Sequence, residues 1–260
     1  MPPADILQRI VATRRQRLGA PAPLALPAVR TTTPAAAGTN RFVQALRTCS
    51  GRAVIAEVKM GSPRLGSLAG RVDPERQAAV YRDHGAAALS VVVEPDYFLG
   101  SYELLARARG ACGLPTIAKD FLVTERQLDD AVVAGADAFL LIAALFEPEE
   151  LRYWAGEVRA RGMAPLVETH DADDLSRLGG ADWEMVGINN RDLKTFDVSL
   201  AASIALRPAV PAGALAVAES GIAGGSDVRR LRDAGFDAFL IGESLLLADD
   251  PARHLAELLS

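Results

Sequence analysis

The sequence predicts an α/β protein, a (β/α)8 barrel (TIM barrel) with additional N-terminal helices. From about residue 53 onward, eight short apolar runs alternate with longer helical patterns. The chain has 260 residues, close to the roughly 250 that such a barrel needs. No GxGxxG follows the first run, so the main signature of a doubly wound dinucleotide-binding sheet is missing. Alternating strands and helices imply parallel strands with right-handed crossovers, and the count of eight favours a closed barrel.

The N-terminal segment precedes the alternating pattern and is expected to cap the barrel. Residues 5–18 have the spacing of an amphipathic helix with arginines on its polar side. A stretch rich in Pro, Ala and Thr runs from about 20 to 38, and a second short helix is predicted around Phe42. We therefore divide the chain into an N-terminal helical extension packed on the barrel, residues 1–48, and a catalytic barrel domain, residues 49–260.

The alternating part of the chain gives each predicted strand a position. The eight apolar runs are residues 53–59, 87–93, 115–119, 137–142, 163–168, 184–188, 214–218 and 237–241. Helical patterns between them include residues 74–85, 124–135, 148–162 and 226–235. Each of these patterns ends in glycine, the residue most often found just past a helix C-terminus.

Composition limits the possible partners. The formal net charge of -5 and the pI near 5.3 argue against nucleic acid or an anionic membrane surface, which favour clustered Lys and Arg. No apolar run approaches the roughly 18 residues of a membrane span, and the N-terminus lacks a secretory pattern. We expect a cytoplasmic protein, for which a monomer is a possible state. Cys49 and Cys112 are isolated, so we expect inert thiols with neither a disulfide nor a zinc site.

Charged and amide side chains stand where the apolar runs end. An unpaired charge in a buried strand is costly, so a protein that keeps such residues is expected to use them. In a barrel the C-terminal ends of the strands face one mouth, where these folds carry out their chemistry. The residues concerned are Glu57, Lys59, Lys119, Glu168, Asn189 and Glu219.

Four of these residues suggest acid–base chemistry. Glu57 and Lys59 are two positions apart, so they point the same way and can pair; the alternative is a structural ion pair that holds the barrel closed. Lys119 is a candidate proton donor, and its alternative, a salt bridge with Asp120, is weaker because neighbours on a strand face opposite sides. Glu168 is a candidate general base, or else a capping or pairing carboxylate.

A second group of residues is typical of an anion site. The segment ESGIAGG follows the seventh run and IGES follows the eighth. Small residues let backbone N–H groups approach a phosphate, and phosphate sites after strands seven and eight recur in this fold. We expect Ser220, Gly221, Gly242 and the Glu243 amide to bind phosphate, although each glycine alone is more often a turn.

Other side chains capable of chemistry have simpler interpretations. His84 and His254 are scattered, and His170, just past Glu168, fits a loop or helix start better than catalysis. Trp154 and Trp183 are expected to pack. Three rings could either stack on an aromatic ligand or pack in the core: Phe98, Phe121 and Phe146.

Taken together, the fragments IAEVKMGSP, EPDYFLGS, LPTIAKDF, GADAFLLI, PLVETH, GINNRDLKTF, VAESGI and FLIGESLL resemble the indole-3-glycerol phosphate synthase family in order and spacing. The resemblance runs from the N-terminal helix to the last residues. It implies a carboxy-lyase of tryptophan biosynthesis that converts 1-(2-carboxyphenylamino)-1-deoxyribulose 5-phosphate, a small sugar phosphate, to indole-3-glycerol phosphate with loss of carbon dioxide and water. It implies no metal and no organic cofactor.

The resemblance also implies a role for each candidate residue. Lys119 would be the acid that polarises the substrate ketone, and Lys59 would steady the substrate anion and help hydroxide leave. Glu168 would remove a proton in the dehydration, and Glu57 would orient Lys59 and balance positive charge on the anilino nitrogen. Glu219 and Asn189 would complete the ring of polar side chains at the mouth. Ser62 and Arg191 would contact the anionic groups of the substrate.

Some positions depart from the usual family pattern. The family commonly has a basic residue and then SPS after the first lysine, whereas here Met60 and Gly61 precede Ser62, Pro63 and Arg64. The first loop has therefore shifted its charge, which would suit a paralogue acting on a substituted anthranilate, although ordinary tryptophan biosynthesis is the stronger interpretation. Ala118 replaces a frequently larger residue but should point away from the mouth.

Three further alternatives stay open. An aldolase would use Lys119 as a Schiff base, and the isomerase acting one step earlier would need a catalytic Cys and Asp at strand ends, which we do not find. A non-catalytic phosphate-binding barrel is a different class. The complete set of strand-end residues argues against it, because a degenerate enzyme should lose chemistry before fold.

Overall fold

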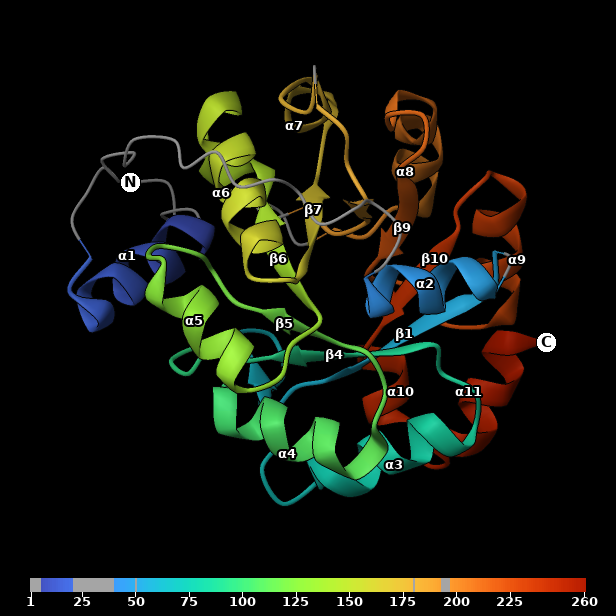
Figure 1. The fold of residues 1–260 in the computed structure, drawn as a ribbon. Coiled ribbons are helices and arrows are strands. Elements are labelled where there is room, and N and C mark those ends of the chain that lie inside the picture. The colour runs from blue at the N-terminus through green and yellow to red at the C-terminus, as the bar shows by residue number, and fades with distance from the viewer. Residues whose placement is uncertain (1–5, 21–39, 50, 180, 193–196) are drawn as a thin grey trace.

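Parallel strands close into a barrel in the order β1-β10-β9-β8-β7-β6-β5-β4, with β4 pairing back to β1 (Figure 1). The structure is a computed structural model and describes residues 6–20, 40–49, 51–179, 181–192 and 197–260. The barrel strands are β1 (Ala53–Val58), β4 (Ala88–Val92), β5 (Thr116–Lys119), β6 (Ala138–Ile142), β7 (Ala164–Thr169), β8 (Met185–Asn189), β9 (Leu215–Glu219) and β10 (Ala238–Ile241). Each predicted apolar run is confirmed as a strand.

Helices surround the barrel and complete the predicted alternation (Figure 1). They are α3 (Pro74–Asp83), α4 (Tyr102–Cys112), α5 (Arg126–Val133), α6 (Pro148–Ala160), α7 (Ala172–Ser176), α8 (Leu200–Leu206), α9 (Gly225–Asp233), α10 (Glu243–Leu247) and α11 (Pro251–Leu259). Short 3-10 turns cover Ala143–Leu145 and Arg207–Ala209, and the loop after β1 holds a small hairpin, β2 (Gly61–Ser62) with β3 (Gly66–Ser67). The predicted glycines after α3, α5, α6 and α9 have positive φ, as expected for a left-handed residue that ends a helix.

Alternation along the strands separates two apolar layers. Ala53 and Ile55 belong to the cluster inside the barrel, whereas Val54 and Ala56 belong to the layer beneath the helices. Because side chains alternate along a strand, Glu57 continues the inward series of β1. The same rule places Ala118 in the outer layer, as predicted, and leaves Lys119 directed inward.

The two N-terminal helices pack on opposite ends of the barrel. Helix α2 (Arg41–Thr48) covers the end where strands begin, since the side chain of Asn40 donates to the carbonyl oxygens of Asp137 and Gly162. Helix α1 (Ile6–Leu18) lies at the other end, where Arg14 binds Asp120 just after β5. Residues 1–5 and 21–39 lie outside the described part of the chain, and the domain boundary at residue 48 stays a prediction.

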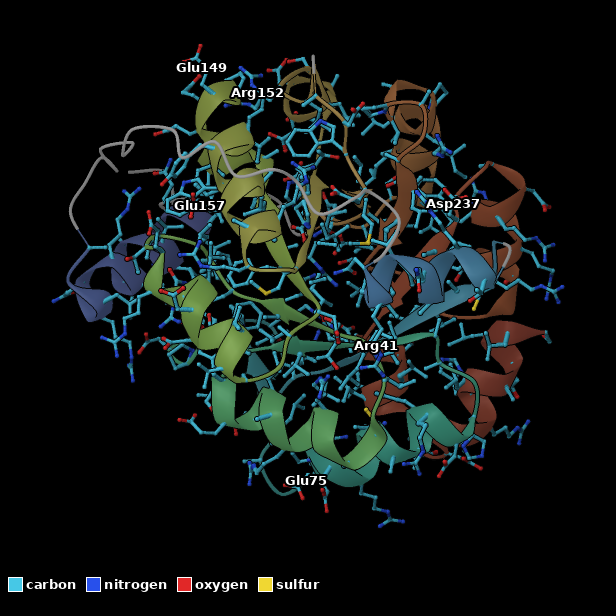
Figure 2. All side chains as sticks on the ribbon, in the orientation of Figure 1. Arg41, Glu75, Glu149, Arg152, Glu157 and Asp237 are labelled. Atoms are coloured by element: carbon cyan, nitrogen blue, oxygen red, sulfur yellow. The ribbon has the colours of Figure 1, made fainter. Side chains whose placement is uncertain are left out.

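The exterior of the barrel is charged and its interior layers are apolar. Glu75 and Glu149 project from the outer faces of α3 and α6 (Figure 2). Trp154 and Trp183 are buried, which confirms their packing role. Both cysteines are free thiols, and the described residues contain no group of His, Cys, Asp or Glu that could hold a metal ion. None of the described helices is long and apolar enough to cross a membrane.

Candidate active site at the carboxyl ends of the strands

A cavity of about 680 Å³ lies over the carboxyl ends of the barrel strands. Strand ends contribute its polar floor, and the loops after β1, β9 and β10 contribute its sides. All the predicted site residues line this cavity except Glu219, which lies beneath it in contact with Lys119. The structure therefore brings these side chains together at one mouth of the barrel, and their roles stay predictions.

Lys119 is the centre of the polar floor. Its Nζ lies 2.8 Å from Glu219 Oε2, 3.4 Å from Glu168 Oε2 and 3.9 Å from Glu57 Oε2. These carboxylates come from β9, β7 and β1, so residues from position 57 to position 219 meet at one ammonium group. Asp120 takes no part, as the alternation along β5 predicted, and binds Arg14 instead.

Lys59 forms the second predicted ammonium contact. It follows the last residue of β1, and its Nζ lies 3.2 Å from Glu57 Oε1. Glu57 therefore has one oxygen toward Lys59 and the other toward Lys119. The close approach of Gly242 makes this arrangement possible, because a Cβ there would lie 2.5 Å from Glu57 Oε1.

Burial and mutual contacts set the charges of this cluster. Burial lowers the pKa of Lys119, but Glu219, Glu168 and Glu57 outweigh it and raise the pKa, so the amine stays protonated. Burial raises the pKa of Glu168, but Lys119, His170 and Asn189 outweigh it and lower the pKa, so the carboxylate stays ionised. Burial and nearby Glu168 raise the pKa of Glu219 to about 8 against the opposing effect of Lys119.

Glu219 is accommodated by a glycine on the neighbouring strand. A Cβ at Gly187 would lie 2.1 Å from Glu219 Oε1. That oxygen is buried and has no hydrogen-bond partner. Because an ionised oxygen buried without a donor is costly, its lack of a partner agrees with the raised pKa. The pKa values of Glu168 and Glu219 therefore shift in opposite directions, although both contact the same lysine.

His170 is the residue of this site that sequence reasoning did not select. Its backbone N–H donates to Asp174 Oδ2 at 2.9 Å at the start of α7, which confirms the predicted role at a helix start. Its ring also forms an ion pair with Glu168, with Nε2 3.1 Å from Oε1. The two-residue spacing from Glu168 was the available signal, since it places both side chains on one face of the chain.

The predicted anion site is built from backbone and small residues. Ser220 and Gly221 both have left-handed backbone, with φ of 66° and 70°, and a Cβ at Gly221 would lie 2.1 Å from Val198 Cγ1. Ser244 Oγ donates to the Ile222 carbonyl at 2.9 Å and ties this loop to the start of α10. The loops after β9 and β10 therefore form one cradle.

The charges beside the cradle include a carboxylate that sequence reasoning did not consider. The Glu243 side chain pairs with Arg64, at the tip of the β2–β3 hairpin, and with Arg191, whose guanidinium lies 3.6 Å away. Ser62 lines the cavity, and its hydroxyl accepts from the Leu65 N–H at 3.0 Å. The changed charge of the first loop therefore faces the cradle. The last four residues of GINNRDLKTF, 193–196, lie outside the described residues.

Apolar side chains form the remaining wall. Phe98 and Phe121 stack with ring centroids 6.0 Å apart and both line the cavity. Phe146 packs instead against Trp154, at 6.5 Å between centroids, so it does not belong to a stacking wall. Helix α1 contributes Ile6, Leu7 and Ile10 to the same cavity.

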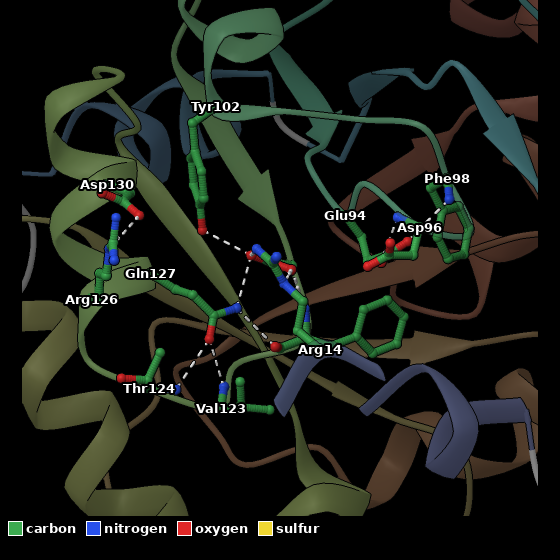
Figure 3. Close-up of polar contacts among 12 residues, drawn as sticks. Arg14, Glu94, Asp96, Phe98, Tyr102, Val123, Thr124, Arg126, Gln127 and Asp130 are labelled. Atoms are coloured by element: carbon green, nitrogen blue, oxygen red, sulfur yellow. Dashed lines mark hydrogen bonds and ion pairs between the residues drawn. The ribbon is translucent and has the colours of Figure 1, made fainter. Parts of the chain in front are cut away.

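A buried ion pair holds α1 in this position (Figure 3). Arg14 donates to both oxygens of Asp120, at 3.0 and 2.6 Å, and Tyr102 and Gln127 donate to the same carboxylate. Gln127 also binds the loop backbone through Phe121 and Val123. The helix that covers the cavity is thereby bonded to the loop directly after Lys119.

The fold and cavity define a (β/α)8 barrel with a buried lysine, several carboxylates and a cradle of backbone and small residues at its mouth. A model of the indole-3-glycerol phosphate synthase family matches residues 7–258, and the chain belongs to this family. Proteins named indole-3-glycerol phosphate synthase from Albidiferax ferrireducens and Laribacter hongkongensis are 43% and 42% identical to it. The alignments cover 98% of this chain in both cases, and 98% and 99% of those proteins. The resemblance read from the sequence motifs is confirmed.

Solved structures of other proteins share the fold. The 3-hexulose-6-phosphate synthase from Salmonella typhimurium has a TM-score of 0.62 over 80% of this chain and 96% of its own, at 14% identity. Thiamine phosphate pyrophosphorylase from Pyrococcus furiosus has a TM-score of 0.59 over 81% of this chain and 95% of its own, also at 14% identity. These likenesses concern the barrel architecture alone.

Proposed function

We propose that this protein is a carboxy-lyase that closes the indole ring of 1-(2-carboxyphenylamino)-1-deoxyribulose 5-phosphate, giving indole-3-glycerol phosphate for tryptophan biosynthesis. Its place in the indole-3-glycerol phosphate synthase family supports this reaction. The observation that carries the proposal is the position of Lys119, held by carboxylates from three strands in a cavity that also contains the backbone cradle.

Lys119 acts as the acid of the first step. The aromatic carbon that bears the carboxylate attacks the substrate ketone, and Lys119 donates a proton to the ketone oxygen as the carbon–carbon bond forms. Carbon dioxide then leaves, and the electrons of its bond to the ring restore the aromatic system. The carboxylates around Lys119 favour its protonated form, which suits this role.

Lys59 and Glu168 act in the dehydration. Lys59 protonates the new hydroxyl group so that it leaves as water, and positive charge develops on the ring nitrogen. The neighbouring C–H becomes acidic, so a weakly basic carboxylate suffices to remove its proton. Glu168, whose pKa is lowered mainly by Lys119 against the effect of burial, is that base. Glu57 holds Lys59 and balances the charge on the nitrogen.

Substrate position is set by the cradle and the apolar wall. Backbone N–H groups of Ser220, Gly221 and Glu243 bind the phosphate, and the anthranilate ring lies against Phe98 and Phe121. Holding the two reacting carbons in contact contributes up to roughly 7 to 11 kcal/mol in favourable cases. Ser62 and Arg191 bind substrate anions, and Asn189 and Glu219 complete the polar ring.

One fluorescence assay tests the reaction and the acid together. The purified protein is mixed with the carboxyphenylamino deoxyribulose phosphate, and indole fluorescence is followed. We expect a signal for the native chain and almost none for Lys119→Ala, with Arg126→Ala on the exposed side of α5 as the control that keeps full rate. No signal from the folded native chain would overturn the function, and full rate in Lys119→Ala would overturn the acid.

Further experiments with the same substrate separate the alternatives. An aldolase using Lys119 as a Schiff base would be inactivated by borohydride in the presence of substrate, whereas the proposed cyclase would not. A non-catalytic barrel would bind the substrate without any indole signal. Ring-substituted anthranilate derivatives, compared by kcat/KM, test the paralogue alternative. Sedimentation tests the monomer prediction, and the cytoplasmic location stays a prediction.

A further inference from the structure

The imidazole of His170 bridges two carboxylates behind the cavity. Nε2 lies 3.1 Å from Glu168 Oε1, and Nδ1 lies 3.3 Å from Asp174 Oδ2. The ring is largely buried, with its side chain 11% exposed, yet it does not line the cavity. It therefore touches the carboxylate proposed as the base without facing the place of the substrate.

The contacts of Glu168 make its two oxygens different. Oε1 lies next to the His170 ring and accepts a hydrogen bond of 3.1 Å from Asn189 Nδ2. Oε2 lies 3.4 Å from Lys119 Nζ. Oε1 is thus held by His170 and Asn189, whereas Oε2 faces Lys119 on the cavity floor.

Asp174 is in turn fixed as a partner for the ring. Its carboxylate accepts from the His170 backbone N–H, and its own N–H donates to Asp171 Oδ1 at 2.9 Å. Arg177 Nε lies 3.9 Å from its other oxygen. The charged groups facing the ring are therefore Glu168 on one side and Asp174 on the other, with Arg177 beyond.

A positive ring suits the charges of the site. The two groups that the ring contacts, Glu168 and Asp174, are both carboxylates. Burial alone lowers the pKa of His170, but the contacts with Asp174 and Glu168 outweigh it and raise the pKa to about 10. Both ring nitrogens then carry protons near neutral pH, so the ring is positively charged between the two carboxylates.

We propose that His170 is a positioning residue of the reaction: held by Asp174, it fixes Glu168 with Oε2 directed at the substrate and keeps that carboxylate ionised. This inference rests on the proposed function, because it needs Glu168 to act as the base of the dehydration. The proton taken up at Oε2 is then readily returned to solvent, since the imidazolium on Oε1 disfavours the protonated acid.

Kinetics of two His170 variants test the role in turnover. His170→Ala removes the contact and should lower kcat about tenfold or more, with KM nearly unchanged. His170→Gln keeps a donor near Oε1 without charge and should recover part of the loss. The matched control His84→Ala removes an exposed histidine and should keep full rate. Native kcat in His170→Ala would overturn the proposal.

A double variant separates this inference from the proposed function. If His170 acts through Glu168, His170→Ala should cost little more in a Glu168→Gln background. Equal losses in both backgrounds would contradict the inference. If Glu168→Gln itself keeps full rate, the assignment of the base fails, and if the native chain gives no indole signal, the proposed function fails.

The pH profile gives a readout that a purely structural role would not move. Loss of the positive ring should raise the pKa of Glu168, so the acid limb of the kcat profile should move to higher pH in His170→Gln. An unmoved acid limb in a variant with native thermal unfolding would count against the proposal.

Nitrogen NMR tests the charge without substrate. The chain contains only 3 histidines, so ¹⁵N spectra of the imidazoles can be assigned with single variants. We expect the His170 ring to be doubly protonated at pH 8 and to lose this proton at lower pH in Glu168→Gln. A neutral ring at pH 8 in the native chain, or an unchanged titration in Glu168→Gln, would overturn the inference.

Discussion

The two ends of the cavity are built on opposite principles. At one end, carboxylates from β1, β7 and β9 lie within 4 Å of the Lys119 ammonium group, and these side chains are largely buried. At the other end, Ser220, Gly221 and Gly242 offer backbone and almost no side chain, and they are more accessible to solvent. Rigid strands position the first group and two loops position the second.

The two ends of the cavity should therefore tolerate different kinds of substitution. In the charged cluster the identity of each side chain matters, so even an isosteric replacement should abolish a proton transfer. In the cradle the absence of a side chain matters, so a single added methyl group should be harmful. The following changes test this contrast.

Glu168→Gln should have the largest effect. The amide has the shape of the carboxylate but cannot accept the proton, and loss of a general base typically costs 10²–10⁴-fold in rate. We expect this loss in kcat, with substrate affinity nearly unchanged because the cradle is intact. Single-turnover measurement of indole formation checks the result, and a loss confined to KM would contradict the contrast.

Gly242→Ala should have an intermediate effect because it touches both ends of the cavity. The new Cβ would lie 2.5 Å from Glu57 Oε1 and 3.0 Å from Glu57 Cβ, so the cradle or the carboxylate must shift. We expect kcat/KM to fall about tenfold or more, given that misplacement by about 1 Å can cost 10²-fold.

Gly110→Ala is the matched control for an added methyl group. Gly110 lies within α4 with no atom within 4 Å of a built Cβ. We expect unchanged kinetics and a gain in stability of about 0.5–1 kcal/mol, because alanine is the better helix former. Equal kinetic losses in both glycine variants would show that close approach at Gly242 is not the cause.

Arg64→Ser should have the smallest effect. Arg64 pairs with Glu243 at the cradle. Its removal leaves the Glu243 carboxylate with less compensating charge beside the proposed phosphate site. Because exposed ion pairs are worth about 0–1 kcal/mol, we expect KM to rise about two- to fivefold, with kcat unchanged. Adding Glu243→Gln should restore KM, and high salt should reduce the difference. A KM that stays high in the double variant would contradict this account.

Local patterns were enough to predict most of the fold. Strands buried on both faces read as continuous apolar runs, and glycine after a helical pattern marks its end, as at Gly85 and Gly235. Charges at the ends of such runs were informative for the same reason, since an unpaired charge such as Lys119 is costly in a buried strand. The twelve site residues came from charged and amide side chains at strand ends, from the segments after the last two strands, and from the family motifs.

Other features depended on distant neighbours. Phe98 and Phe146 look alike in the sequence, yet one lines the cavity and the other packs behind β6 against Trp154. The ring of His170 was assigned only a helix-start role because its contact with Glu168 depends on how the chain leaves β7. The pairing of Arg64 with Glu243 joins residues 179 positions apart.

Local sequence was enough to specify the alternation of strands and helices, the face on which each strand-end side chain lies, and the glycines that keep the cradle open. These follow from local periodicity and backbone freedom, which each segment carries alone. Barrel closure fixed three further features: Lys119 meets three carboxylates, α1 is held over the cavity through Arg14, and the pKa values of two glutamates on one lysine shift in opposite directions. Those outcomes depend on barrel closure, which sets the distances and burial across the mouth that no segment specifies.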